Sequence, residues 1–207
     1  MNYGIIAAGK GERLTSEGIS LPKPLVAPAG EPLIRRLIRI MSMPGGEAAM
    51  TRLGVIVREP EIAGSVREAC ASLGIDAPLD LTVKATADSM LSFAEVTGRF
   101  KGDFIVTTVD TVFEQSEMIR LAEAFAARTD ADGYMGVSEY ADDEKPLWVS
   151  TDADGSQPSP TDAATTPATC RPESTACPRQ LWSAWHSAAQ PASHACATSS
   201  ARCSTRV

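Results

Sequence analysis

Short apolar runs alternate with amphipathic stretches along the chain up to about residue 149. The apolar runs cover residues 3–8, 53–57, 79–83, 104–109 and 134–137. Each has the length and composition of a strand that is buried on both faces of a sheet. Because parallel strands need long crossover connections, which are usually helices, this alternation predicts an α/β fold: a Rossmann-like, mostly parallel sheet flanked by helices.

The stretches between these runs have helical periodicity. Residues 32–41 place their apolar side chains on one stripe and their arginines on the other. Further helices are expected over residues 60–73, 88–97 and 116–128, and we interpret the apolar stripe of the last as core packing. Cys70 lies on an apolar helical face, which favours a core position over a role as a nucleophile.

The composition changes abruptly from residue 156 onward. Residues 151–207 contain 12 Ala, 9 Ser, 8 Thr and 6 Pro, and they contain no Ile, Phe, Met, Tyr or Lys. So little apolar surface cannot offset the entropy lost when the chain becomes ordered. We therefore predict an incomplete N-terminal domain over residues 1–150, followed by a low-complexity, disordered tail over residues 156–207.

The tail also has the composition of a GC-rich gene that is read out of register. In the frame that begins at the third base of each codon, residues 169–175 permit the peptide YVSAGIY, and residues 190–205 permit AGESRMRNFQRALLDA. Directly after Gly155 the same frame permits ITAFTD, which has the pattern of a strand. We interpret the tail as the product of a frameshift near Gly155. A genuine disordered tail is the alternative.

Charge and composition restrict the class of partner. The net charge is −7 and the sequence pI is about 4.9, so no nucleic-acid partner is expected. The N-terminus has no basic region and no apolar run long enough for a secretory signal or a membrane span, which favours a cytoplasmic protein without a membrane partner. Four of the five cysteines lie in the last 38 residues without CxxC spacing, so they predict neither disulfides nor a zinc site. The oligomeric state stays open.

The first apolar run leads into a glycine-rich segment, residues 7–14 (AAGKGERL), and residues 22–25 (PKPL) follow it. At the carboxyl end of a central strand, glycines let backbone N–H groups approach an anion without obstruction by Cβ atoms. Arg13 and Lys23 add the positive charge that a reacting triphosphate requires. The segment therefore predicts a phosphate-binding site.

Three elements in order, AAGxGxRL, PKPL and GxPLI at residues 30–34, resemble the signature of the sugar-phosphate nucleotidyltransferase superfamily. The resemblance implies an enzyme that moves an NMP group from an NTP to a sugar 1-phosphate or a similar phosphorylated small molecule, with Mg²⁺ as cofactor and release of pyrophosphate. It implies that Arg13 and Lys23 are catalytic cations at the phosphates. It also implies that Ala8, Gly9 and Gly11 bind the substrate triphosphate.

The resemblance extends to two later segments. Asp110 ends the apolar run 104–109, where the superfamily has its metal-binding carboxylate, and a carboxylate suits Mg²⁺. The alternative is that Asp110 only caps the following turn. Residues 84–90 fall where the superfamily reads base and ribose, which implies substrate contacts for Asp88 and Ser89 although the usual Gly-Thr pair is absent. The alternative for Asp88 is a helix N-cap.

The superfamily takes a second metal-binding carboxylate and most of its acceptor pocket from the region after the fifth strand, which is missing or scrambled here. The resemblance therefore implies an impaired enzyme. An unrelated glycine turn and a non-catalytic nucleotide-binding module are alternatives. A dinucleotide-binding oxidoreductase domain, with Glu59 at the ribose, is a weaker one because Leu14 stands in place of the third glycine of that fingerprint.

Overall fold

The computed structural model describes residues 1–16, 18–127, 134–138 and 171–177. For residues 12, 13, 135, 137, 138 and 171–177 only the backbone is described. The strands form one six-stranded sheet in the order β3-β2-β1-β4-β6-β5. Their bounds are β1 (Asn2–Ala7), β2 (Arg52–Val57), β3 (Leu79–Val83), β4 (Phe104–Thr108), β5 (Tyr134–Ser138) and β6 (Arg171–Cys177).

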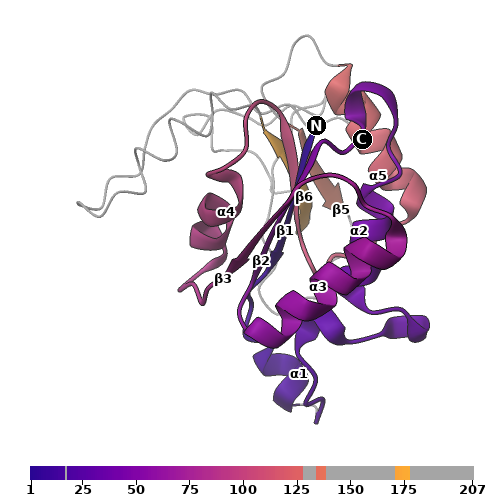
Figure 1. Ribbon diagram of the computed structural model, residues 1–207. Helices are drawn as coiled ribbons and strands as arrows, with labels where there is room; N and C mark the ends of the chain where they lie inside the picture. The colour runs from indigo at the N-terminus through magenta and orange to yellow at the C-terminus, as the bar shows by residue number, and fades with distance from the viewer. Residues whose placement is uncertain (17, 128–133, 139–170, 178–207) are drawn as a thin grey trace, which may run out of the picture.

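Strands β1 to β4 are parallel to one another, and β6 runs antiparallel to both β4 and β5. Helices flank the sheet on both faces, as Figure 1 shows: α2 (Leu33–Met41), α3 (Pro60–Leu73) and α5 (Gln115–Ala126) cover one face, and α4 (Ser89–Thr97) covers the other. The predicted α/β fold with a mostly parallel sheet is confirmed. Helix α1 (Glu12–Ser16) was not predicted, because five residues are too few to show a helical period.

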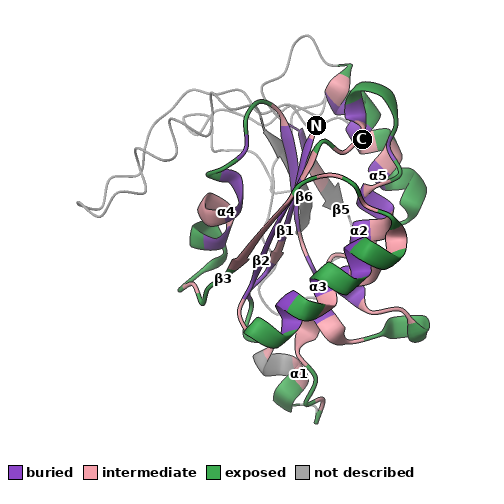
Figure 2. Ribbon diagram, in the orientation of Figure 1, coloured by how far each residue is buried: buried purple, intermediate pink, exposed green. Residues whose placement is uncertain are grey.

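In β1, β2 and β4, side chains of alternate residues enter two separate apolar clusters. Figure 2 shows that these central strands are largely buried. In β1, Tyr3, Ile5 and Ala7 belong to the larger cluster, which lies beneath α2, α3 and α5. The smaller cluster lies beneath α4, and two phenylalanine rings at its centre, Phe100 and Phe104, have centroids 5.8 Å apart. Because both faces of the central strands are buried, the strands have the continuous apolar composition from which they were predicted.

Two glycines allow the α4 segment to lie close against the sheet. A Cβ atom on Gly54 of β2 would lie 2.7 Å from Cζ of Phe100, and a Cβ atom on Gly4 of β1 would lie 2.7 Å from Cγ1 of Val96. Contacts this short do not occur between real atoms, so the side chains of Val96 and Phe100 occupy space that only glycine leaves free. The position of α4 over β1 and β2 therefore depends on both glycines.

Strand β6 lies within the segment that we predicted to be disordered. Its backbone pairs with β4 from Phe104↔Cys177 to Thr107↔Ser174, and with β5 on its other side. The prediction rested on the lack of apolar side chains, whereas strand pairing uses backbone N–H and C=O groups that β4 offers along its open edge. Composition therefore could not find this strand. The rest of residues 156–207, and Gly155 itself, lie outside the described residues.

Within the part of the chain that the structure describes, no helix has the length and apolar character needed to cross a membrane.

Candidate functional site

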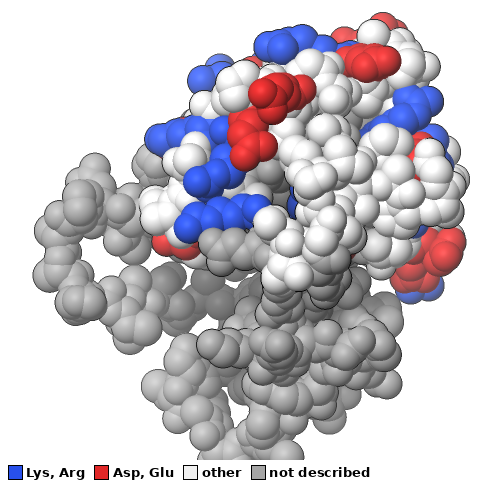
Figure 3. Space-filling model, turned by 90° about the horizontal axis from the view of Figure 1, so that it is seen from below, with Lys and Arg blue, Asp and Glu red and all other residues white. Residues whose placement is uncertain are grey.

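A cleft of about 620 Å³ lies at the edge of the sheet where the parallel strands end. Figure 3 views the molecule from this edge and shows Lys and Arg side chains gathered on one side of it. The loops that follow β1, β2, β3 and β4 all contribute to the walls. Seven residues selected from the sequence line the cleft: Ala8, Gly9, Gly11, Lys23, Asp88, Ser89 and Asp110.

The glycine-rich loop brings Lys23 to the cleft. Gly11 has a φ of +66°, a left-handed conformation that glycine adopts without steric cost. A Cβ atom added at Gly11 would lie 3.6 Å from Cβ of Lys23, so the loop and the Lys23 segment are in contact. The left-handed turn at Gly11 therefore lies directly beside Lys23.

Two prolines hold the segment that carries Lys23. Lys23–Leu25 forms a single 3₁₀ turn with Pro22 at its N-cap, and the backbone N–H of Leu25 donates to the Pro22 carbonyl at 2.8 Å. Pro24 is buried and anchors the turn, whereas the Lys23 side chain stays about one third exposed, at 31%. A fixed backbone limits the positions that the flexible lysine side chain can reach.

Lys23 forms an ion pair across the cleft with Asp110. Nζ of Lys23 donates to Oδ2 of Asp110 at 2.6 Å, and the Asp110 side chain is 24% exposed. Asp110 lies in a turn after β4 that is closed by the backbone N–H of Thr111, which donates to the Thr108 carbonyl at 3.2 Å. The structure thus brings Lys23 and Asp110, both selected from the sequence, into direct contact.

The surroundings of Asp110 favour its ionised form. Burial by itself raises the pKa of this carboxyl, but the hydrogen bond from Lys23 and the positive charge of Lys23 outweigh burial. A hydrogen bond from Thr108 and one from its own backbone add to the effect, so the pKa of Asp110 lies below its ordinary value. At neutral pH the cleft therefore contains a carboxylate beside an ammonium group.

The loop between β3 and α4 forms the far wall of the cleft. Asp88 is the N-cap of α4, and its Oδ1 accepts a hydrogen bond from the backbone N–H of Leu91 at 2.8 Å. This confirms the N-cap alternative for Asp88. Thr86 and Ser92 share a hydrogen bond between hydroxyl groups at 2.6 Å. Ser89, the first residue of the helix, faces the same cleft.

Sequence reasoning gave no role to several polar residues that line the cleft: Lys10, Arg58, Thr86, Ser92 and Thr108. Arg58 and Thr108 could have been predicted, because each lies at the carboxyl end of a parallel strand, where α/β sheets bind their ligands. Arg13 belongs to α1, but its side chain lies outside the described residues. The structure therefore does not test whether the Arg13 guanidinium joins Lys23 and Asp110.

The described residues contain no group of three or more His, Cys, Asp or Glu side chains that would hold a metal ion by itself. Asp110 is a single carboxylate at the cleft. Mg²⁺ is commonly held by one or two carboxylates together with substrate phosphates and water. The donor set therefore fits a magnesium ion that enters with a phosphorylated ligand.

Glu59, which an oxidoreductase domain would place at a ribose, has a different position. It is the N-cap residue of α3, with no hydrogen bond from its side chain to the helix. Among the described residues, Glu59 is not one of those that line the cleft. The geometry therefore gives no support to the dinucleotide alternative.

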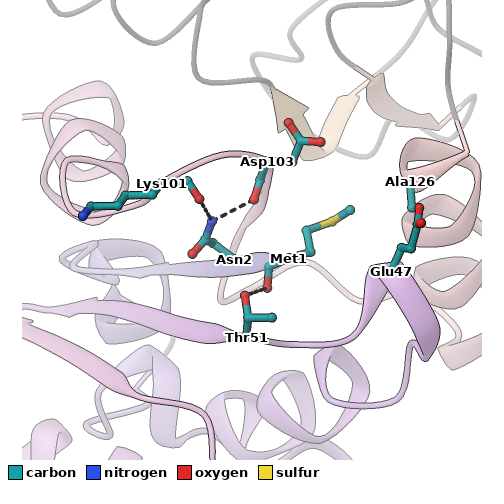
Figure 4. Close-up of a pocket in the computed structure, with 7 residues that line it drawn as sticks. All are labelled: Met1, Asn2, Glu47, Thr51, Lys101, Asp103 and Ala126. Carbon is teal, nitrogen blue, oxygen red and sulfur yellow. Dashed lines mark hydrogen bonds between the residues drawn. The ribbon is translucent and has the colours of Figure 1, made fainter.

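A second hollow, of about 320 Å³, lies at the opposite edge of the sheet, where β1 and β4 begin (Figure 4). Asn2, almost fully buried, donates from Nδ2 to the carbonyls of Lys101 and Asp103 at 2.8 and 2.9 Å. Thr51 Oγ1 donates to the Met1 carbonyl at 3.0 Å. These hydrogen bonds tie the amino end of the chain to neighbouring loops, and they account for the side chains of Asn2 and Thr51 in this hollow.

Neither a protein-family model nor a curated protein matches the chain. Solved structures do match. The inositol-1-phosphate CTP transferase from T. maritima aligns with a TM-score of 0.69 at 17% identity, over 90% of this chain and 74% of that one. HddC from Yersinia pseudotuberculosis aligns with a TM-score of 0.61 at 17% identity, over 87% and 77%.

The 4-diphosphocytidyl-2C-methyl-D-erythritol synthase from Anaerococcus prevotii aligns with a TM-score of 0.55 at 12% identity, over 93% of this chain and 77% of that one. These likenesses establish the fold, which the chain shares with the inositol-1-phosphate CTP transferase and the other two matched structures.

Proposed function

We propose, from this fold and the cleft it forms, that the chain derives from an enzyme that transfers an NMP group from an NTP to a sugar 1-phosphate or a similar phosphorylated small molecule. In this reaction an oxygen of the acceptor phosphate attacks the α-phosphorus of the NTP. The bond between the α-phosphorus and the bridging oxygen breaks, and pyrophosphate leaves with the electron pair. The observation that carries the proposal is the Lys23–Asp110 ion pair beside the glycine-rich loop.

The residues of the cleft suit the charge that this reaction develops. Backbone N–H groups around Gly9 and Gly11 would hold the β- and γ-phosphates without interference from side chains. The Lys23 ammonium would bind the α-phosphate, whose oxygens gain charge as the acceptor attacks. Arg13 would add a second cation, because a guanidinium can bind two phosphate oxygens at once.

Asp110 and the phosphates of the substrate would hold the magnesium ion. When bound, Mg²⁺ neutralises phosphate charge and fixes the orientation of the phosphate chain. In the absence of a ligand, Asp110 instead accepts the hydrogen bond from Lys23. The ion pair therefore keeps both groups at the cleft in the absence of a ligand.

We further propose that a frameshift near Gly155 has replaced the acceptor-binding half, so that the 207-residue chain binds an NTP but turns over slowly or not at all. Residues 169–175, which permit YVSAGIY in the alternative frame, overlap β6. An apolar strand at this place would complete the sheet between β4 and β5 better than the present sequence does. Sequencing the gene across codons 150–160 tests the idea, and an intact frame in a fresh isolate would remove it.

The function is tested with a panel of NTPs and sugar phosphates, with pyrophosphate release as the readout. We expect the 207-residue chain to bind an NTP by calorimetry, and a version with its frame restored after Gly155 to release pyrophosphate. In the restored version, Lys23→Ala and Asp110→Ala should each lower the rate by about a hundredfold or more. Lys101→Ala, an exposed lysine at the opposite edge of the sheet, is the matched control. Near-normal turnover of both cleft variants would contradict the site assignment.

A further inference from the structure

Among the residues that the structure describes, Arg58 is the one Lys or Arg that lines the cleft without a partner. Three described Lys and Arg side chains line the cleft: Lys10, Lys23 and Arg58. Lys23 is paired with Asp110, and Lys10 has an interaction of its own. Within the described part of the structure, Arg58 makes no hydrogen bond or ion pair, and it is half-buried. A half-buried guanidinium group without a partner at a cleft is available for a ligand.

The register of the sheet fixes where Arg58 stands relative to Asp110. Val57 pairs with Ala7, so Arg58 emerges from β2 beside Ala8. On the other side of β1, Thr108 pairs with Ile6, so Asp110 also emerges at the level of Ala8. Because neighbouring strands lie about 4.8 Å apart, the backbones of Arg58 and Asp110 are about 10 Å apart across the cleft.

This separation assigns the two residues to different parts of one ligand, an assignment that rests on the proposed function. A nucleotide with its phosphates at the glycine-rich loop, Lys23 and Asp110 extends away from β4 and toward β2 and β3. Its base then lies between Arg58 and the loop that leads to α4, where Thr86 and Ser89 line the cleft.

The chemistry of arginine indicates which bases would be bound. Arginine has five N–H donors in a planar fork and no acceptor, so it pairs best with two neighbouring acceptors. Cytosine offers O2 and N3, and guanine offers O6 and N7. Adenine places its amino group beside each edge nitrogen, and uracil and thymine place an N–H between their two carbonyls. We propose that Arg58 reads the base and selects a cytosine or guanine nucleotide over an adenine, uracil or thymine nucleotide.

The test measures dissociation constants of CTP, GTP, ATP and UTP with Mg²⁺ for the full chain and its variants. Wild type should bind CTP or GTP at least tenfold more tightly than ATP and UTP. Arg58→Ala should reduce this ratio by about tenfold or more, and Arg58→Lys should reduce it similarly because lysine keeps the charge but lacks the fork. Arg58→Gln should shift the preference toward ATP, because a glutamine amide matches the donor and acceptor of adenine.

Arg67→Ala is the matched control, because Arg67 is an exposed arginine on α3 that also has no partner within the described residues. It should leave all four constants unchanged. The tighter of the CTP and GTP dissociation constants shows whether Arg58 selects cytosine or guanine. Equal binding of all four nucleotides by wild type, or an unchanged ratio in Arg58→Ala, would overturn this inference and leave the proposed function intact. If wild type binds none of the four, the proposed function fails, and this inference fails with it.

Discussion

Lys23 and Asp110 are 87 residues apart in the sequence, yet Nζ of Lys23 lies 2.6 Å from Oδ2 of Asp110. The two residues meet because β1 and β4 are adjacent parallel strands whose carboxyl ends lie at the same edge of the sheet. Each partner neutralises the other in the free protein. A ligand that carries phosphates and a cation would replace this ion pair with two contacts, one between Lys23 and a phosphate and one between Asp110 and the cation.

The ion pair predicts opposite effects of one substitution with and without Mg²⁺. In Asp110→Asn the Lys23 ammonium loses its competing carboxylate, so metal-free NTP should bind several-fold more tightly than it binds to wild type. With Mg²⁺ the same variant should bind NTP about tenfold more weakly, because an amide is a poor ligand for the ion. Calorimetry in EDTA and in excess Mg²⁺ measures both. Weaker NTP binding both in EDTA and in Mg²⁺ would mean that Asp110 does not compete with the NTP for Lys23.

Asp110 also predicts a dependence of stability on pH. Burial raises the pKa of Asp110, but its hydrogen bond and ion pair with Lys23 outweigh burial and lower the pKa below its unfolded value. The stabilisation is therefore complete above about pH 4 and is lost as the pH falls through the folded pKa. Urea unfolding should show wild type about 1 kcal/mol more stable than Asp110→Asn at pH 6. This difference in unfolding free energy should shrink below pH 4. A difference that stays constant with pH would show that the ionised form of Asp110 does not stabilise the fold.

The sequence predicted the parallel part of the sheet and its helices because their apolar periods are strong and local. Predicted and observed bounds of these elements differ by two residues at most; residues 116–128, for example, correspond to Gln115–Ala126. The glycine-rich loop was recognised from its spacing, and both Lys23 and Asp110 line the cleft. Their direct contact could not be predicted, because it depends on which strands are neighbours, and strand order is not a local property of the sequence.

Strand β6 and Arg58 were missed for different physical reasons. Strand β6 has no apolar pattern in its sequence, and it pairs with β4 and β5 through its backbone. Arg58 carries no motif, so it stood out only when the register placed it beside Ala8 at the cleft. The pairing of β6 and the position of Arg58 at the cleft both depend on strands that are distant in the sequence. Pattern analysis therefore finds elements and loops, whereas the sheet order decides which residues meet.

A buried hydroxyl in the core predicts a measurable contribution to stability. Tyr3 is fully buried, and its hydroxyl donates to the Ala48 carbonyl at 2.7 Å, while burial raises the pKa of the phenol and keeps it neutral. Tyr3→Phe leaves that buried carbonyl without its donor and should cost about 1–3 kcal/mol in the free energy of unfolding. Thr51→Val removes an exposed hydrogen bond and should cost less than about 0.5 kcal/mol in the same urea titration. Equal losses of unfolding free energy in the two variants would contradict a larger contribution from the buried Tyr3 hydrogen bond.

The close approach of α4 to the sheet predicts that alanine is tolerated at one glycine and not at another. In Gly54→Ala the new Cβ would lie 2.7 Å from the Phe100 ring, so the ring or the strand must move, at a cost of about 1–3 kcal/mol in the free energy of unfolding. Gly64→Ala is the matched control, because Gly64 is an exposed position within α3 with no atom within 4 Å of the added Cβ. It should stabilise the protein by about 0.5–1 kcal/mol, because alanine loses less backbone entropy than glycine in a helix.

The ring is the specific obstacle to this added methyl group, and a double-mutant cycle tests that. Phe100→Leu shortens the side chain that the new Cβ meets, so Gly54→Ala should cost clearly less in the Phe100→Leu background than in wild type. Urea unfolding of the four proteins gives the coupling energy, which should be about 0.5 kcal/mol or more. Additive costs would show that the strand, and not the phenylalanine ring, resists the methyl group at Gly54.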